Sequence, residues 1–241
     1  MVPGIAVIDQ DEHLWVLHKP AGLLIAPGRG PDKQDCVSAR VQTMDAQARL
    51  VHRLDQPTSG VLLMARSLTV QRQLNEAFAH REVSKIYLAV VAGMVIPHSD
   101  WQYIDAPIGL HWPDRPRHHV GPGGKPSQTW WRSLAASEDD SKTLVALRPV
   151  TGRSHQLRLH LQSIGLPIWG DALYAPTAVA QGSSRLLLHA WQLGLIHPVS
   201  GDNRTWQAPC PEELLAGFCQ QTVAMRLQNA LITPPTGDCD A

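Results

Sequence analysis

The chain has 241 residues, and its 21 basic and 21 acidic side chains give a formal net charge of zero. This length predicts one large domain or two small ones, with enough residues for a core. Hydrophobic residues make up 44% and charged residues 17%, which is typical of soluble globular proteins, and no apolar run approaches the roughly 20 residues that span a bilayer. Zero net charge argues against binding nucleic acid through overall charge but leaves room for a local basic face.

The cysteines and the N-terminus bear on the cellular compartment. The sequence has no C-x-x-C pair, and its cysteines stand far apart at positions 36, 210, 219 and 239, so no disulfide framework is expected. The N-terminus lacks the basic segment and the long apolar segment of a secretory signal. A reducing compartment fits best, and we expect a cytoplasmic protein.

Apolar runs predict strands and helices in the first part of the chain. Strands are expected at residues 5–8, 14–17, 50–51, 61–64 and 85–91. A short helix is expected between 37 and 50. A longer helix is expected after Ser67, a suitable N-cap, because apolar residues between 70 and 78 recur at helical spacing. On the strand at 85–91, Lys85 and Tyr87 share one face.

Residues 51–60 are the first candidate site. Pro57 and Gly60 indicate a turn, and one carboxylate, Asp55, lies at its start. A carboxylate on a loop held by rigid strands is a common place for chemistry. Arg53, two residues earlier, faces the same side of an extended chain. The alternative is that Asp55 only accepts backbone N–H bonds within its own turn.

Two basic turns precede this site. A Lys-Pro-x-Gly element at residues 19–22 predicts a stiff turn that presents the Lys19 cation. Lys19 would then contact a phosphate or line a site, and the alternative is an ordinary surface turn. Residues 27–31 form a flexible basic loop in which Arg29 is available for contact with a partner.

Proline, glycine and histidine crowd residues 97–127, which we refer to as the arm. A long irregular stretch inside a compact domain is usually functional or disordered. Trp112 beside Arg115, Arg117 and Lys125 predicts a mobile arm suited to stacking on a base, and the alternative is a surface loop with no partner. The four histidines of the arm lack metal-finger spacing to a cysteine, so no zinc site is expected.

The sequence after the arm predicts a hairpin and then a helix. Strands at 129–134 and 142–150 are expected to pair. A helix should follow because Leu157, Leu161 and Ile164 fall on one helical face. The remaining elements are expected to be strands at 186–190, 193–196 and 204–206, a short helix at 212–215, and a frayed end from about 233.

The start of the helix that contains Leu157 is the second candidate site. Thr151 or Ser154 is expected to cap it, and Gly165 suits its end. Arg153 lies at the start, where free N–H groups and the helix dipole favour an anion, either a phosphate or a buried carboxylate. Arg158, one turn further on, is expected to reach solvent or RNA.

The sequence resembles the RluA family of pseudouridine synthases in three motifs. These are His52-Arg53-Leu54-Asp55, Lys85-x-Tyr87-Leu88-Ala89 and Gly152-Arg153-x-His155-Gln156-Leu157-Arg158. Further matching motifs follow the family order: Lys19-Pro20-x-Gly22, Pro167-Ile168-x-Gly170-Asp171 and Leu188-His189-Ala190. Together the motifs are far more specific than any one of them, and the resemblance covers about residues 5–215.

The resemblance implies an α+β fold with a mixed, mostly antiparallel central β-sheet flanked by helices and loops. It implies one catalytic domain over residues 1–232, followed by a flexible tail at 233–241. An S4 RNA-binding domain, which several relatives carry at the N-terminus, is not expected because Lys19-Pro20 comes too early in the chain. We expect a monomer.

The resemblance also implies a reaction. Isomerising uridine breaks an N-glycosidic bond and rejoins the base through carbon without redox change, so no cofactor and no metal are expected. The resemblance assigns the nucleophile to Asp55, the cation that keeps it ionised to Arg153, and contact with the target base to Tyr87. Attack on the base, attack on the sugar and abstraction of a ribose proton all stay open for Asp55. Leu157 either lines the base pocket or packs in the core.

The implied substrates are RNA stem-loops, namely the tRNA anticodon stem-loop and a stem-loop of 23S ribosomal RNA. Family members that act on both RNAs have similar residues at three places: the Pro-Gly-Arg run at 27–29, the tip of the arm (Trp112-Pro113-x-Arg115-Pro116) and Ser154. The target base would leave its stack, at a cost of a few kcal/mol. The residues expected to contact RNA are Lys19, Arg29, His52, Arg53, Arg115, Arg117 and Arg158.

Two other classes of function are alternatives. A glycosidase-like hydrolase would pair Asp55 with a second carboxylate at a fixed gap. The acid nearest the motifs is Asp171, which we interpret as structural in its own turn. A catalytically silent RNA-binding module would have no need of Asp55, Tyr87 and Arg153 together.

Overall fold

The structure of the protein is a computed structural model that describes residues 2–96 and 100–232. The chain divides into two compact units. The first comprises Met1–Ile86 and His189–Pro209, and the second comprises Tyr87–Leu188 and Cys210–Ala241. In both units the strands pair mostly in the antiparallel sense and helices pack beside them, which confirms the expected mixed α+β class.

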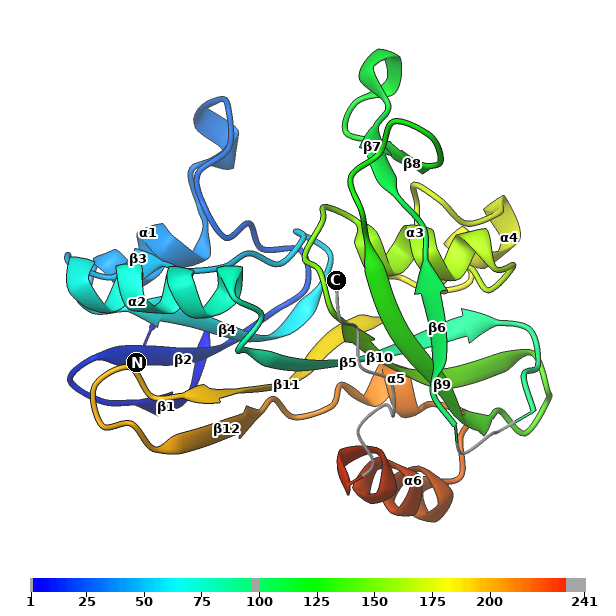
Figure 1. Cartoon of the computed structure of the whole chain (residues 1–241). Helices are drawn as coiled ribbons and strands as arrows, with labels where there is room; N and C mark the ends of the chain where they lie inside the picture. Colours follow the sequence, from blue (N-terminus) through cyan, green and yellow to red (C-terminus); the bar gives the residue numbers. More distant parts are fainter. Residues whose placement is uncertain (1, 97–99, 233–241) are drawn as a thin grey trace. The chain divides into compact units, whose positions relative to one another are not determined.

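The sheet of the first unit has the strand order β1-β2-β4-β11-β12, and β3 pairs with the end of β4. Strands β4 and β11 run parallel, whereas the other pairs are antiparallel. Helices α1 and α2 lie over this sheet (Figure 1). The elements are β1 (Ala6–Gln10), β2 (Leu14–Lys19), η1 (Pro31–Lys33), α1 (Val37–Gln42), β3 (Arg49–Leu50), β4 (Ser59–Ala65), α2 (Leu68–Ala79), β11 (Leu188–Ile196) and β12 (Asn203–Gln207).

Helix α2 is the amphipathic helix that the sequence predicts. The Ser67 side chain accepts a hydrogen bond from the Val70 N–H at 3.2 Å and caps the helix as expected. Val70 and Leu74 are buried in a core cluster that includes Leu63 of β4. Each such side chain stabilises the fold by about 1.5–3 kcal/mol. This packing makes β4, the strand that follows Asp55, a rigid support.

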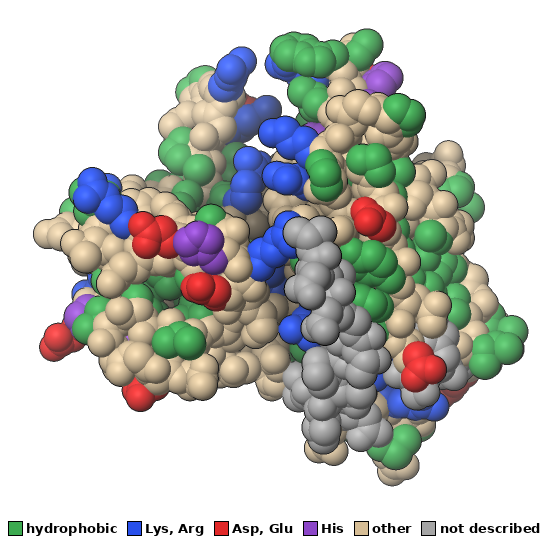
Figure 2. All heavy atoms as spheres, in the orientation of Figure 1, with side chains coloured by type: hydrophobic (Ala, Val, Ile, Leu, Met, Phe, Trp, Pro, Cys, Tyr) green, Lys and Arg blue, Asp and Glu red, His purple; other side chains and the backbone are tan. Residues whose placement is uncertain are grey.

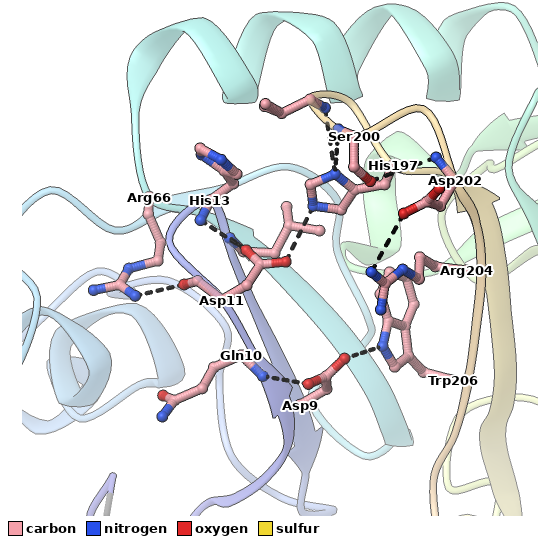
Figure 3. Close-up of polar contacts among 12 residues, drawn as sticks. Asp9, Gln10, Asp11, His13, Arg66, His197, Ser200, Asp202, Arg204 and Trp206 are labelled. Carbon is pink, nitrogen blue, oxygen red and sulfur yellow. Dashed lines mark hydrogen bonds and ion pairs between the residues drawn. The ribbon is translucent and has the colours of Figure 1, made fainter.

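Polar contacts tie the two hairpin turns of the first unit together. Figure 3 shows Asp11, from the turn between β1 and β2, pointing toward His197, from the turn between β11 and β12. The His197 Nε2 atom lies 3.1 Å from Asp11 Oδ2, and the Trp206 indole donates to Asp9 at 2.7 Å. Burial raises the pKa of Asp11, but hydrogen bonds from the His13 and Leu14 N–H groups more than offset this and hold it below its ordinary value.

The sheet of the second unit has the antiparallel order β5-β10-β9-β6. Helix α3 lies beside β8, and α6 lies beside β9 (Figure 1). The elements are β5 (Ser84–Ala92), β6 (Gln102–Asp105), β7 (Ile108–Leu110), η2 (Trp112–Asp114), β8 (His118–Val120), β9 (Gln128–Ala136), β10 (Lys142–Pro149), α3 (Gln156–Ser163), α4 (Thr177–Gln181), α5 (Glu212–Leu215) and α6 (Gln220–Ile232). The predicted hairpin after the arm is therefore confirmed.

The arm is more regular than its composition suggests. Strands β7 and β8 pair as an antiparallel hairpin whose register joins Ile108 to Val120. A Cβ atom added at Gly124 would lie 2.6 Å from the Ile108 carbonyl carbon, so the backbone can close on itself only where a side chain is missing. The expectation of an irregular arm is wrong for this hairpin and for β6, which lies within the arm and pairs with β9. Residues 97–99 of the arm, and the tail at 233–241, lie outside the described residues.

The prediction of separate strands at 186–190 and 193–196 is also wrong. The structure has one strand, β11, over most of this stretch. Gln192, which interrupts the apolar run in the sequence, stays in the strand and pairs with Gln207 of β12. Its amide also contacts the Gln207 amide at 2.9 Å, so a polar residue at this position does not end the ladder.

Candidate active site

Asp55 begins a tight turn over residues 55–58, which we refer to as the Asp55 turn. Its carbonyl accepts the Thr58 N–H at 3.0 Å, and its side chain is partly exposed. The turn leads into β4, where Gly60 has φ +122° and a Cβ atom would lie 2.1 Å from the Ala190 oxygen of β11. Only glycine allows this approach of two backbones. The turn therefore rests on a strand whose position is fixed.

Lys19 anchors the Asp55 turn from inside the first unit. Its ammonium group is 0% exposed and donates to the carbonyls of Pro20 at 2.8 Å, Gln56 at 2.9 Å and Thr58 at 2.8 Å. These three bonds account for all three donors of an ammonium group. A direct phosphate contact and an ordinary surface turn are therefore both wrong for Lys19, which is buried and holds the backbone on both sides of Pro57. Lining of a site by Lys19 stays a prediction.

The rest of the Lys-Pro-x-Gly element packs against the same turn. The Gly22 N–H donates to the Gln56 carbonyl at 2.9 Å, and the Gln56 side chain donates to the Gly22 carbonyl at 3.0 Å. Gly22 has φ +84°, a conformation that favours glycine. The two motifs that the sequence places 34 residues apart thus form one structure around the backbone of residue 56.

His52 is committed to the fold of the first unit. Its Nε2 atom accepts the Leu63 N–H at 2.9 Å, and its ring stacks on Phe78 with centroids 4.9 Å apart. Burial, with a smaller contribution from the Lys85 charge, lowers the pKa of His52 to about 3. The ring is therefore neutral at physiological pH and fixes the loop before Asp55. Contact of His52 or of the exposed Arg53 with RNA stays a prediction.

Tyr87 opens the second unit on β5. It pairs with Leu147 of β10 and is half-buried, whereas Ile86 and Leu88 on either side are buried. The predicted alternation of faces along this strand is confirmed. Lys85 shares the face of Tyr87, and burial lowers its pKa.

Arg153 lies in an exposed turn over residues 151–155, which we refer to as the Arg153 turn. Its Nε atom donates to the Pro126 carbonyl at the end of the arm, at 3.4 Å. Neither predicted cap is found at the start of α3. His155 is the N-cap residue, with φ +57°, and Thr151 instead donates to the Gln156 side chain at 2.7 Å. The predicted end of the helix is confirmed, with Gly165 at φ +80° just beyond it.

A buried amide, Gln156, holds the backbone of the Arg153 turn. Its Oε1 atom accepts the Arg153 N–H at 3.0 Å in addition to the Thr151 hydroxyl. Its Nε2 atom donates to the Gln128 carbonyl and to the Thr129 hydroxyl, both at 2.9 Å. All four hydrogen-bonding positions of the amide are used. The sequence motifs do not reveal this role, and the one signal for it is a glutamine among apolar helical residues.

The same network continues to the base of the arm. The His160 Nε2 atom lies 3.0 Å from the Ala106 carbonyl, which can only accept, so this nitrogen carries the proton. The Nδ1 atom then accepts the Thr129 hydroxyl at 2.9 Å. Burial lowers the pKa of His160, in agreement with a neutral ring. A chain of neutral groups thus runs from Ala106 through Thr129 and Gln156 to the Arg153 backbone.

Arg158 does not reach solvent or RNA, so that expectation is wrong. It is 3% exposed and forms two hydrogen bonds to Asp171, at 2.8 and 2.5 Å. Asp171 also accepts the N–H groups of Leu173 and Tyr174 at 3.0 and 3.1 Å. The segment that carries Asp171 covers the face of α3 that periodicity predicts to be exposed. The structural interpretation of Asp171 is confirmed, and this acid is not available as a second catalytic carboxylate.

Leu157 is 7% exposed and belongs to the core, as one of its two interpretations has it. Lining of a base pocket by Leu157 stays a prediction.

Among residues 2–96 and 100–232 there is no group of three or more His, Cys, Asp or Glu side chains that could hold a metal ion. The cysteines within these ranges, Cys36, Cys210 and Cys219, are free, and Cys239 lies outside them.

Among the basic residues expected to contact RNA, Lys19 and Arg158 are buried, whereas those of the arm and of the loop before η1 are exposed. In the arm, Arg115 stacks over the Trp112 ring at 3.2 Å from its centroid, and Arg117 lies 3.2 Å from Asp114. In the first unit, Arg29 is exposed just before η1. Figure 2 shows Lys and Arg side chains over the tip of the arm and over the loop that carries η1. The neutral chain thus has local basic surface.

Residues 13–163 match the family model described as RNA pseudouridylate synthase. The chain belongs to this family and is an RNA pseudouridine synthase. No helix in the described part of the chain is long and apolar enough to cross a membrane.

Within the family the chain is similar to dual-specificity RNA pseudouridine synthases RluA, which confirms the resemblance to the RluA family. It is 41% identical to the one from Escherichia coli K12 over 208 residues, which cover 86% of this chain and 94% of that protein. It is 44% identical to the one from Yersinia pestis over 196 residues, 81% of this chain and 94% of the relative. Among solved structures, human RNA Pseudouridylate Synthase Domain Containing 1 matches with a TM-score of 0.78 and 26% identity, covering 99% of this chain and 98% of that one.

Proposed function

We propose that the enzyme isomerises uridines in stem-loops of tRNA, including the anticodon stem-loop, and of 23S ribosomal RNA. Support comes from relatives that are named for dual specificity, to which the chain is 41% identical in sequence. It also comes from the exposed cations of the arm and of the loop before η1, which suit contacts with RNA phosphates. We further propose that the enzyme works as a monomer in the cytoplasm.

Asp55 is the proposed nucleophile, and the Asp55 turn is the observation that carries this proposal. A reactive carboxylate has to be accessible and yet fixed in position. Asp55 is partly exposed, and the carbonyls of the next residues are held by a fully buried ammonium group. A carboxylate that only stabilised its own turn would not require this support.

Arg153 and Tyr87 are the proposed partners of Asp55. A guanidinium favours the ionised form of a nearby carboxylate and orients it through paired bonds that lysine cannot copy. The aromatic ring of Tyr87 would stack on the target uracil and assist loss of the C5 proton. Family resemblance supports both assignments, together with the exposure of Arg153 and the half-exposure of Tyr87.

In the proposed reaction the bond between N1 and C1′ of uridine breaks, and a bond between C5 and C1′ forms. The proton on C5 is lost, N1 gains a proton, and no electrons are exchanged with a cofactor. The target base leaves its stack first, which costs least in a loop that is already partly unstacked. Attack by Asp55 on the base or the sugar and abstraction of a ribose proton are all compatible with this balance.

The products of one assay separate this function from its rivals. The enzyme is incubated with a tRNA transcript that carries tritium at C5 of its uridines. Release of tritium with the chain intact marks isomerisation, free uracil marks hydrolysis, and neither marks simple binding. We expect tritium release without free base. A map of pseudouridines in RNA from a strain lacking the gene then identifies the modified positions, and loss of sites in only one RNA class would refute dual specificity.

A further inference from the structure

The hydroxyl group of Tyr174 joins two parts of the second unit that the motif analysis treats separately. Its oxygen lies 2.6 Å from Nδ1 of His155 and accepts the His118 N–H at 3.0 Å. His155 belongs to the Arg153 turn, and His118 opens strand β8 of the arm. Since the oxygen accepts from His118, the hydroxyl proton is available to His155. One side chain therefore bridges the arm and the turn.

His155 is the residue at which the chain reverses between Arg153 and α3. Its φ of +57° lies in the left-handed region, which residues other than glycine seldom adopt. Such a conformation persists where surrounding contacts determine it, and it occurs often at functional sites. The Tyr174 hydroxyl contacts the His155 ring directly, and the ring of His118 lies against it with centroids 5.1 Å apart. These contacts hold the ring of the left-handed residue that joins Arg153 to the start of α3.

Tyr174 is itself held by buried groups. Its N–H donates to Asp171, and the Arg158 guanidinium lies 5.0 Å from the centroid of its ring. Arg158 and Asp171 are among the most buried charged residues of the described chain, at 3% and 1% exposure. A buried bidentate pair with further hydrogen bonds is rigid. The hydroxyl is therefore presented to His155 from a fixed base.

We infer that Tyr174 is a positioning residue for Arg153 and that it couples the arm to the Arg153 turn. The hydroxyl keeps His155 left-handed, which aims Arg153, and it keeps β8 in register with that turn. Contact of RNA with the arm is thereby transmitted to the turn through His118 and His155. This inference rests on the proposed catalytic role of Arg153.

Tyr174→Phe tests the hydroxyl while keeping the ring and its packing on Arg158. We expect kcat to fall about ten-fold or more, because a small displacement of a catalytic group slows the reaction strongly. KM should change by less than about three-fold. The midpoint of thermal unfolding should stay within about 2 °C of the wild type. Thr205→Val is the control, since it also removes one hydroxyl group and Thr205 is exposed on β12 in the first unit. It should keep wild-type kcat.

A double-variant cycle separates positioning of Arg153 from a general structural role. Tyr174→Phe is also made in an Arg153→Lys background and measured under single-turnover conditions. If Tyr174 acts through Arg153, its removal costs less than about two-fold once the guanidinium is gone. An equal fold-loss in both backgrounds would overturn the inference, as would wild-type kcat in Tyr174→Phe alone.

The outcome for Arg153→Lys alone distinguishes this inference from the proposed function. A loss of about 100-fold supports the role of Arg153, whereas near-normal rates refute that role whatever Tyr174 does. If Tyr174→Phe folds poorly, His155→Ala replaces it. Alanine disfavours the left-handed conformation and cannot reach the Tyr174 hydroxyl, so kcat should fall in the same way. Unchanged kcat in a stable His155→Ala enzyme would also contradict the inference.

Discussion

The Asp55 turn and the Arg153 turn each carry one proposed catalytic side chain, but buried groups of different charge hold their backbones. A single buried cation, Lys19, holds the first turn through three backbone carbonyls. Uncharged groups hold the second, chiefly the Gln156 amide and the Tyr174 hydroxyl. In both cases the proposed catalytic side chain is at least partly exposed, while hydrogen bonds from buried groups hold the backbone of its turn. In each turn one residue is accessible to a substrate, and other, buried residues keep the turn rigid.

This difference predicts how much stability the protein loses when the support of each turn is removed. Loss of a buried cation leaves carbonyls without a donor, and no neighbouring group can easily replace three charge-assisted bonds. Loss of a neutral amide leaves donors and acceptors unpaired, but some of them can turn toward each other. The charged support should therefore be the more costly to remove.

Lys19→Met keeps the length of the side chain and removes the ammonium group. We expect the free energy of unfolding to fall by about 3–5 kcal/mol, because three backbone carbonyls each lose a charge-assisted hydrogen bond from a buried ammonium group. Denaturant unfolding measures this. Lys33→Met, at an exposed position of η1, is the control and should change stability by less than about 0.5 kcal/mol. A loss no larger than the control's would show that Lys19 does not support the Asp55 turn.

Gln156→Leu removes the amide at nearly constant volume. It should cost about 2–4 kcal/mol of stability, and it should lower kcat because the Arg153 N–H loses its acceptor. Gln162→Leu, on an exposed position of the same helix, is the matched variant and should leave both quantities near the wild type. If Gln156→Leu destabilises more than Lys19→Met, the order predicted for charged and neutral supports is reversed.

His52→Gln tests the neutral ring beside the Asp55 turn. The pKa of His52 in the fold, about 3, lies below its unfolded value of about 6.5, so its contribution is complete above pH 6.5 and is lost as the pH falls toward 3. Between pH 6.5 and pH 5 the wild type should lose about 1–2 kcal/mol more than the variant. Chemical denaturation at both pH values measures this. His80→Gln, at an exposed histidine, should keep the wild-type dependence, and equal slopes for all three proteins would contradict the assignment.

Local patterns in the sequence predicted much of the scaffold. Helix α2 with its Ser67 cap and the hairpin of β9 and β10 follow from spacing and from residue type. Pro57 and Gly60 also located the turn that carries Asp55, and helical periodicity placed Arg153 at the start of a helix. These features depend on contacts between residues that are close in the sequence.

The supports of the two turns were not predicted, because they depend on distant segments. Periodicity shows which face of α3 is apolar, but not that the segment carrying Asp171 covers the other face and buries Arg158. Lys19 is a partial exception. It ends β2, in which Leu14, Trp15, Val16 and Leu17 are all buried, and such an unbroken apolar run indicates a strand covered on both faces. A lysine at the end of that run was therefore a candidate for burial.

If the Asp55 carboxylate performs the isomerisation, Asp55→Asn should abolish the reaction without abolishing RNA binding. The variant keeps the shape of the side chain and removes its charge. We predict that tritium release from C5 of uridine falls to background while the Kd for the same RNA stays within a few-fold of the wild type. Tritium release at a rate comparable to the wild type would contradict it.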